Sequence, residues 1–126
     1  MVFWVLAGLV LYLVQIYLSA AIYLPVEGLA RHAGGRDTLP ERGVYAGRAE
    51  RALVNLKENM PFFLTLALLA LIIEGADMGQ AVLGAQIFVL SRAAYVVLYL
   101  ISIPWTRSAA YTVSIVGLLM MAAAVV

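Results

Sequence analysis

The chain has 126 residues, of which 65% are hydrophobic and only 12% are charged, whereas a soluble domain carries about a quarter charged residues. This composition indicates one integral membrane domain over residues 1–126, and the net charge of +1 gives no indication of nucleic-acid binding. The absence of cysteine excludes disulfides and a cysteine nucleophile, and with His32 as the single histidine no metal site is expected within the chain.

The apolar segments predict an all-α membrane protein, a bundle of four transmembrane helices. The first apolar run is too long for a signal peptide and is expected to end before Pro25. A polar loop and then a short acidic turn, Glu74–Asp77, separate the next segments, and Pro104 marks the end of the third helix. The expected helices are residues 2–24, 48–73, 80–103 and 108–126.

The distribution of basic residues predicts the orientation in the membrane. Five arginines lie in or beside the first loop and Arg107 lies in the third, whereas the second loop carries only acids. The positive-inside rule therefore places loops 1 and 3 in the cytoplasm and both termini on the opposite side.

The second helix combines a polar first half with a short apolar second half. Its uncharged stretch, Met60 to Ile73, has 14 residues and spans about 21 Å, so about six preceding residues must also lie at membrane depth to cross a core of about 30 Å. These residues include Asn55 and Glu58. Arg92, in the middle of the third helix, lies at a similar depth, which predicts a Glu58–Arg92 ion pair. A structural clamp would explain Arg92, while the Glu58 carboxylate also has capacity for a ligand ammonium group.

Three of the expected helices carry a polar stripe toward the cytoplasmic half of the membrane. If these stripes face one another, they form a pocket rich in Arg, Asn and Tyr, which suits a polar, anionic ligand. Each element also has a simpler interpretation: Arg48, Arg51 and Lys57 as snorkelling residues, Arg107 as a topological anchor, and tyrosines as interfacial anchors. The stripes are Arg51, Asn55 and Glu58; Arg92, Tyr95 and Tyr99; and Arg107, Tyr111 and Ser114.

These motifs, taken in order, resemble the MAPEG family (membrane-associated proteins in eicosanoid and glutathione metabolism). The resemblance rests on Arg51-Ala-Leu-Val-Asn55-Leu-Lys-Glu58 followed by Pro61-Phe62-Phe63, on Arg92, Tyr95 and Tyr99, and on Arg107-Ser108-Ala-Ala-Tyr111. It covers roughly residues 45–114. The first string alone is a weak motif, but the three together are fairly specific.

The resemblance implies a homotrimer in which glutathione, as cosubstrate, binds between neighbouring subunits. Arg107 would stabilise the glutathione thiolate, because a nearby cation lowers the pKa of a thiol, and Ser108 would hydrogen-bond the sulfur. Arg51 and Asn55 would hold carboxylate and amide groups, and Glu58 would hold the amino group. The remaining residues of the expected glutathione-binding set are Arg48, Arg92, Tyr95, Tyr99 and Tyr111.

Two departures from the family pattern bear on the substrate. Asn59 follows Glu58 where eicosanoid-type members often carry an aromatic residue, and Tyr95 replaces the histidine of the prostaglandin-synthase branch. The resemblance therefore favours a glutathione transferase or glutathione-dependent peroxidase acting on a lipophilic electrophile that arrives through the bilayer. The alternatives are a non-catalytic scaffold of the same fold and a small four-helix transporter, which would be expected to carry an acid in its first helix.

Overall fold

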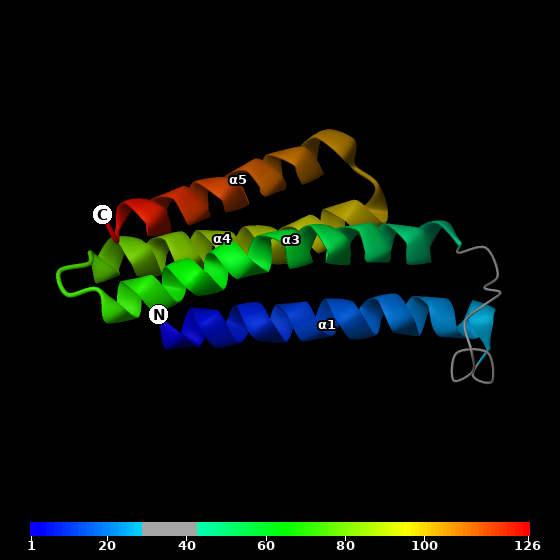
Figure 1. The fold of residues 1–126 in the computed structure, drawn as a ribbon. Coiled ribbons are helices and arrows are strands. Elements are labelled where there is room, and N and C mark those ends of the chain that lie inside the picture. Colours follow the sequence, from blue (N-terminus) through cyan, green and yellow to red (C-terminus); the bar gives the residue numbers. More distant parts are fainter. Residues whose placement is uncertain (29–42) are drawn as a thin grey trace.

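The computed structural model describes residues 1–28 and 43–126, which form four helices in antiparallel order. Figure 1 shows an elongated bundle with both termini and the α3–α4 turn at one end and the α4–α5 turn at the other. Each helix is long and apolar enough to cross a membrane, so the predicted four-helix transmembrane bundle is confirmed. The helices are α1 (Val2–Glu27), α3 (Val44–Ile72), α4 (Met78–Ile101) and α5 (Pro104–Ala123).

Neither of the two prolines predicted to mark the end of a helix does so in the structure. Helix α1 continues through Pro25 and ends at Glu27. Gly28 caps it, with a φ of 80° that favours glycine and an N–H that donates to Leu24 O at 2.8 Å. Helix α4 ends at Ile101, and α5 begins at Pro104 instead of near Ser108. Proline is favoured at the first position of a helix because the N–H it lacks would have no partner there.

The other helix ends lie within a few residues of the predicted ones. Helix α3 starts at Val44, one turn earlier than expected, and α4 starts at Met78, where Asp77 Oδ1 accepts a hydrogen bond from Gln80 N at 3.0 Å. The C-terminal end is tied to this turn, because Asp77 N donates to Ala124 O at 2.9 Å.

Aromatic stacking and small residues hold the helices together. The rings of Phe63 and Phe88 stack with centroids 4.6 Å apart in the core between α3 and α4, and both side chains are buried. Gly8 brings α1 against this stack, since a Cβ there would lie 2.9 Å from Phe63. Between α4 and α5, a Cβ on Gly84 or on Gly117 would come within 2.6 Å of the other residue's carbonyl oxygen. Helices α4 and α5 are therefore the most closely packed pair, whereas α1 is the least buried span.

Candidate functional site

A polar cavity of about 330 Å³ lies between α3, α4 and α5, toward the α4–α5 turn. All seven residues that line it carry a polar group, which is unusual inside a bundle built to face lipid. One comes from α3, two come from α4 and four come from α5, so the cavity joins the three predicted stripes. The lining residues are Asn55, Tyr95, Tyr99, Arg107, Ser108, Tyr111 and Thr112.

Arg92 lies behind the wall of this cavity and fixes Asn55. Its side chain is 1% exposed, and its Nη1 donates to Asn55 Oδ1 at 2.5 Å. The guanidinium also lies 5.0 Å from the ring centroid of Tyr111 and 5.6 Å from that of Tyr95. Arg92 uses one of the two lone pairs of the Asn55 amide oxygen, so this side chain still has two N–H donors and one lone pair for a ligand.

The predicted Glu58–Arg92 ion pair is wrong for the described structure. Arg92 bonds to Asn55 instead, and Glu58 is exposed and does not line the cavity. Counting residues placed the two groups at the right depth, but Glu58 lies three residues beyond Asn55 and therefore points about 60° away around the helix. The Nε and Nη2 atoms of Arg92 have no hydrogen-bond partner among the described residues.

Tyr99 brings two arginines to the mouth of the cavity. Arg51 Nε donates to Tyr99 Oη at 3.2 Å, and the Arg107 guanidinium lies 4.8 Å from the Tyr99 ring centroid. Tyr95 packs between Tyr99 and Tyr111, with ring centroids 5.5 Å and 6.4 Å away. Arg107 is half-buried while Arg51 is exposed, so Arg51 reaches the site through Tyr99. Two positive charges consequently border one polar cavity.

Arg48 was expected in the same set, but it lies elsewhere. Its Nη1 donates to Leu100 O at 3.0 Å, and its guanidinium lies 5.6 Å from the Tyr45 ring centroid. Leu100 is in the last turn of α4, where carbonyl groups lack helical partners and attract a cation. Arg48 thus links α3 to α4 and does not line the cavity. Ser114, the last member of the α5 stripe, is also outside it, since it is fully buried and donates to Tyr111 O at 2.7 Å.

Two polar residues at the site had not been predicted from the sequence. Thr112 lines the cavity, and its Oγ1 donates to Ser108 O at 3.1 Å. Asn59 is buried on α3 and its Nδ2 donates to Asn55 O at 2.8 Å. Each lies four residues from a predicted site residue, and this spacing was the signal that would have identified both.

A second, mostly apolar cavity of about 650 Å³ continues between α3 and α5 toward the other end of the bundle. It begins at Asn59, one turn beyond Asn55, and reaches Ala122 near the end of α5. The lining residues are Asn59, Pro61, Phe62, Thr65, Leu66, Ile115, Leu118, Leu119 and Ala122.

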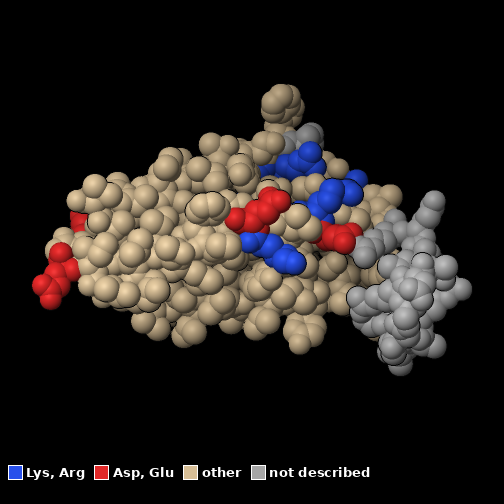
Figure 2. All heavy atoms as spheres, viewed as in Figure 1, with Lys and Arg blue, Asp and Glu red and all other residues tan. Residues whose placement is uncertain are grey.

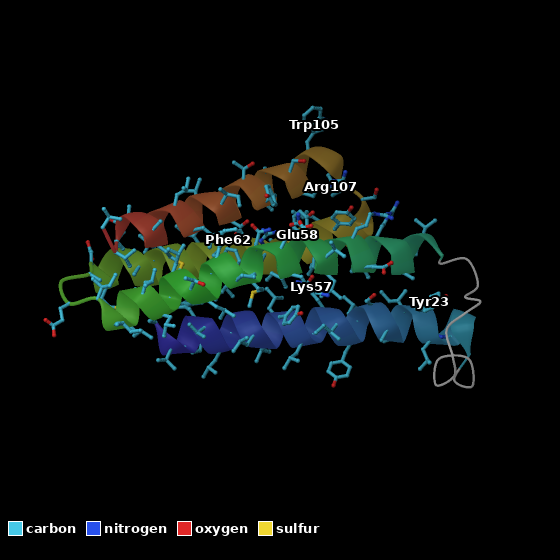
Figure 3. The ribbon with its side chains drawn as sticks, in the orientation of Figure 1. Tyr23, Lys57, Glu58, Phe62, Trp105 and Arg107 are labelled. Atoms are coloured by element: carbon cyan, nitrogen blue, oxygen red, sulfur yellow. The ribbon has the colours of Figure 1, made fainter. Side chains whose placement is uncertain are left out.

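The surface around the site is marked by charge and by one large aromatic residue. Figure 2 shows acidic and basic side chains together over the half of the bundle nearer the α4–α5 turn, whereas the other end carries only acidic ones on this face. Trp105, two residues before Arg107, is 87% exposed and projects away from the bundle in Figure 3. Tryptophan favours the membrane–water interface, so the polar cavity lies near that level.

A sequence model of the MAPEG family matches residues 1–126, the whole chain. A search of curated proteins finds no match. Together with the four apolar helices, the family match shows a multi-pass integral membrane protein.

Proposed function

The chain belongs to the MAPEG family, and we propose that it is a membrane glutathione transferase, a glutathione-dependent peroxidase, or both. Membership supports a role in glutathione or eicosanoid metabolism in general. The observation that carries the finer proposal is that Arg107 and Ser108 share one cavity with Asn55, Tyr95, Tyr99 and Tyr111. The family's characteristic arginine thus borders a site that offers hydrogen-bond donors at membrane depth.

The donors of the cavity suit the anionic groups of glutathione, which carries two carboxylates and one thiol. Arg51 and Arg107 both supply positive charge beside Tyr99. The contact with Arg92 fixes the amide of Asn55, which has two N–H donors for an oxygen of the ligand. Guanidinium groups bind carboxylates strongly in such settings. We assign a carboxylate to Arg51, a carbonyl or carboxylate oxygen to Asn55, and the amino group to Glu58 at the edge of the site.

Arg107 then acts on the sulfur. A cation beside a thiol favours its thiolate and lowers its pKa, so the nucleophile is available near neutral pH, and the Ser108 hydroxyl donates to the sulfur. In conjugation, the thiolate forms a C–S bond and the leaving group departs or the electrophile takes a proton. In peroxide reduction, the sulfur bonds to a peroxide oxygen, the O–O bond breaks and the alcohol leaves. A second glutathione then gives the disulfide and water.

The apolar cavity beside the site fits the lipophilic part of the electrophile. Its walls of Phe62, Leu66, Ile115 and Leu119 continue from Asn59, next to the polar cavity, toward the middle of the bilayer. A molecule dissolved in lipid would therefore place its chain there and its reactive group near Arg107. We further propose the homotrimer expected of the family and a cytoplasmic position for the α4–α5 turn, from the distribution of arginine.

Thiolate absorbance in the ultraviolet on adding glutathione to purified protein tests the mechanism. Arg107→Gln should remove the band and the conjugation of a generic aromatic electrophile, whereas Arg107→Lys, which keeps the charge, should retain part of both. Size exclusion in detergent checks that each variant remains assembled. If the parent protein shows neither a band nor turnover, the enzyme assignment fails, and glutathione binding without turnover would indicate a non-catalytic scaffold.

A further inference from the structure

Asn59 carries a buried amide that uses only part of its hydrogen-bonding capacity. Its side chain is 7% exposed, and its Nδ2 donates to Asn55 O, the carbonyl oxygen one turn earlier in α3. A carbonyl oxygen only accepts hydrogen bonds, so this contact also fixes which end of the amide faces Asn55. The second N–H of Nδ2 and the Oδ1 acceptor have no hydrogen-bond partner among the described residues.

This amide lies where the polar cavity gives way to the apolar one. On α3, Asn55 lines the polar cavity and Asn59, one turn later, lines the apolar cavity. On α5 the same change occurs between Thr112 and Ile115, again within one turn. Beyond Asn59 the lining of the second cavity is apolar except for Thr65. Asn59 is therefore the first polar group that a lipophilic molecule in the apolar cavity meets on the side of Arg107 and Ser108.

The chemistry of the amide defines the group that fits beside it. A buried polar group without a hydrogen bond is costly, and a hydrocarbon chain offers neither a donor nor an acceptor. An anionic group would be attracted instead to Arg51 and Arg107, so the partner of Asn59 is neutral and carries one donor and one acceptor. A hydroperoxide, R–O–O–H, has its donor on the terminal oxygen and an acceptor on the neighbouring inner oxygen. The free N–H and Oδ1 of Asn59 match this arrangement.

We propose that Asn59 binds the hydroperoxide group of a lipophilic peroxide and thereby selects peroxides over other electrophiles. This inference rests on the proposed function, in which the glutathione sulfur lies beside Arg107 and Ser108. Asn59 Oδ1 accepts a hydrogen bond from the terminal O–H, and the free N–H donates to the inner oxygen. The apolar part of the peroxide then occupies the cavity lined by Phe62 and Leu119. Asn59 is thus a specificity-determining residue at the boundary between the two cavities.

The same two hydrogen bonds favour the chemical step. The glutathione sulfur bonds to the terminal oxygen, the O–O bond breaks, and its electron pair moves to the inner oxygen. The terminal oxygen keeps its hydrogen as a sulfenic acid, while the inner oxygen takes up the proton that the thiol released and leaves as the alcohol. Negative charge develops on the inner oxygen, so the N–H of Asn59 stabilises the transition state more than the bound peroxide. An electrophile without a hydroperoxide group gains nothing from this contact.

Steady-state kinetics with cumene hydroperoxide and with chlorodinitrobenzene, which has no hydroperoxide group, test this selection. Asn59→Leu should lower kcat/KM for the hydroperoxide about tenfold or more, the effect of losing about one to two hydrogen bonds. It should leave kcat/KM for chlorodinitrobenzene and the KM for glutathione close to the parent values. Equal losses with both substrates would show that Asn59 acts only on the fold, and an unchanged rate with the hydroperoxide would show that it does not bind the peroxide. Either result overturns the proposal.

A second variant separates the two hydrogen bonds and keeps the local structure. The hydroxyl of Asn59→Thr still donates to Asn55 O and still has lone pairs to accept from the peroxide, but it lacks the second N–H. This variant should therefore lower kcat for the hydroperoxide more than it raises KM. Ser91→Ala is the matched control, because it removes a buried hydrogen bond to the backbone of its own helix and lines neither cavity. Its kinetics should equal those of the parent protein.

Thermal unfolding without glutathione tests the binding alone, because a compound that binds the folded protein raises its Tm. Cumene hydroperoxide should raise the Tm of the parent protein more than cumene, which has the same apolar group, and Asn59→Leu should abolish this difference. No difference in the parent protein, or the same difference in Asn59→Leu, overturns the proposal even if chlorodinitrobenzene is conjugated. Conversely, a difference that depends on Asn59 in a protein without turnover would keep the peroxide site while the proposed function fails.

Discussion

Substitution of Asn55 should separate the stability of the fold from the binding of ligand. Arg92 is 1% exposed, and its one hydrogen bond to the described residues goes to Asn55 Oδ1. Asn55→Leu keeps the approximate size of the side chain but removes this acceptor, and Arg92 has no access to water there. Hydrogen bonds to charged groups contribute about 1.5–3 kcal/mol, so we expect a loss of about 2 kcal/mol in the free energy of unfolding.

Asn55→Asp is the matched variant. It places a carboxylate where the amide oxygen stood, so the contact with Arg92 is kept and the free energy of unfolding should stay close to that of the parent protein. Both variants lose the two N–H donors that we assign to glutathione, and the added negative charge repels its carboxylates. We therefore expect the KM for glutathione to rise about tenfold or more in each, a factor that corresponds to about 1.4 kcal/mol.

The free energy of unfolding is measured on purified protein by titrating a mild detergent solution with a denaturing one and following helical circular dichroism. The KM comes from initial rates with a generic aromatic electrophile. The reasoning is refuted if Asn55→Leu unfolds at the same detergent composition as the parent, or if Asn55→Asp is destabilised as much as Asn55→Leu. Either result would mean that the Arg92–Asn55 contact does not hold α3 against α4.

Four further predictions follow from particular contacts. Gly117→Ala should destabilise the bundle by about 1–3 kcal/mol, because its Cβ would meet a backbone oxygen, whereas Gly43→Ala, with open space around it, should melt like the parent protein in the same thermal unfolding experiment. Phe63→Ala removes one ring of the buried stack and should cost about 3–5 kcal/mol in that assay. Tyr99→Phe removes the acceptor that orients Arg51 but keeps the ring beside Arg107, so the KM for glutathione should rise while kcat changes little in steady-state kinetics. Arg48→Gln should leave this KM unchanged, because Arg48 bonds to Leu100 O outside the cavity, and a large increase in KM would return Arg48 to the binding site.

The number and approximate bounds of the helices could be predicted from the sequence, because hydropathy and helix-breaking residues depend only on neighbouring positions in the chain. Four apolar runs predicted the four helices, and the i, i+4 and i, i+3 spacings brought Asn55, Tyr95, Tyr99, Arg107 and Tyr111 to one cavity. Residue spacing does not give the rotation of each helix about its own axis, because that rotation depends on how the helices pack. The Gly84–Gly117 contact and the Phe63–Phe88 stack set that rotation.

The errors follow from this limit. Arg92 met Asn55 and not Glu58 because a depth count contains no angle. Arg48 lies outside the cavity because it bonds to a carbonyl group at the end of α4, a contact that its spacing before Arg51 does not indicate. The position of Pro104 was also predicted incorrectly, because proline can follow one helix or begin the next. The short turn between α4 and α5 depends on the left-handed conformation of Ser102, which the residue pattern does not indicate.

The close approach of α4 and α5 has a consequence for how the chain assembles during synthesis. These two helices are joined by the turn at Ser102 and Ile103 and make the most extensive contact in the bundle, so as a hairpin they need little loop closure to meet. Helix α1 packs only against α3 and α4 among the described helices, and both are made after it. We therefore expect α1 to enter the bilayer before the helices that it packs against, and to join the bundle late. Its nearly uniform apolar surface suits that interval in lipid.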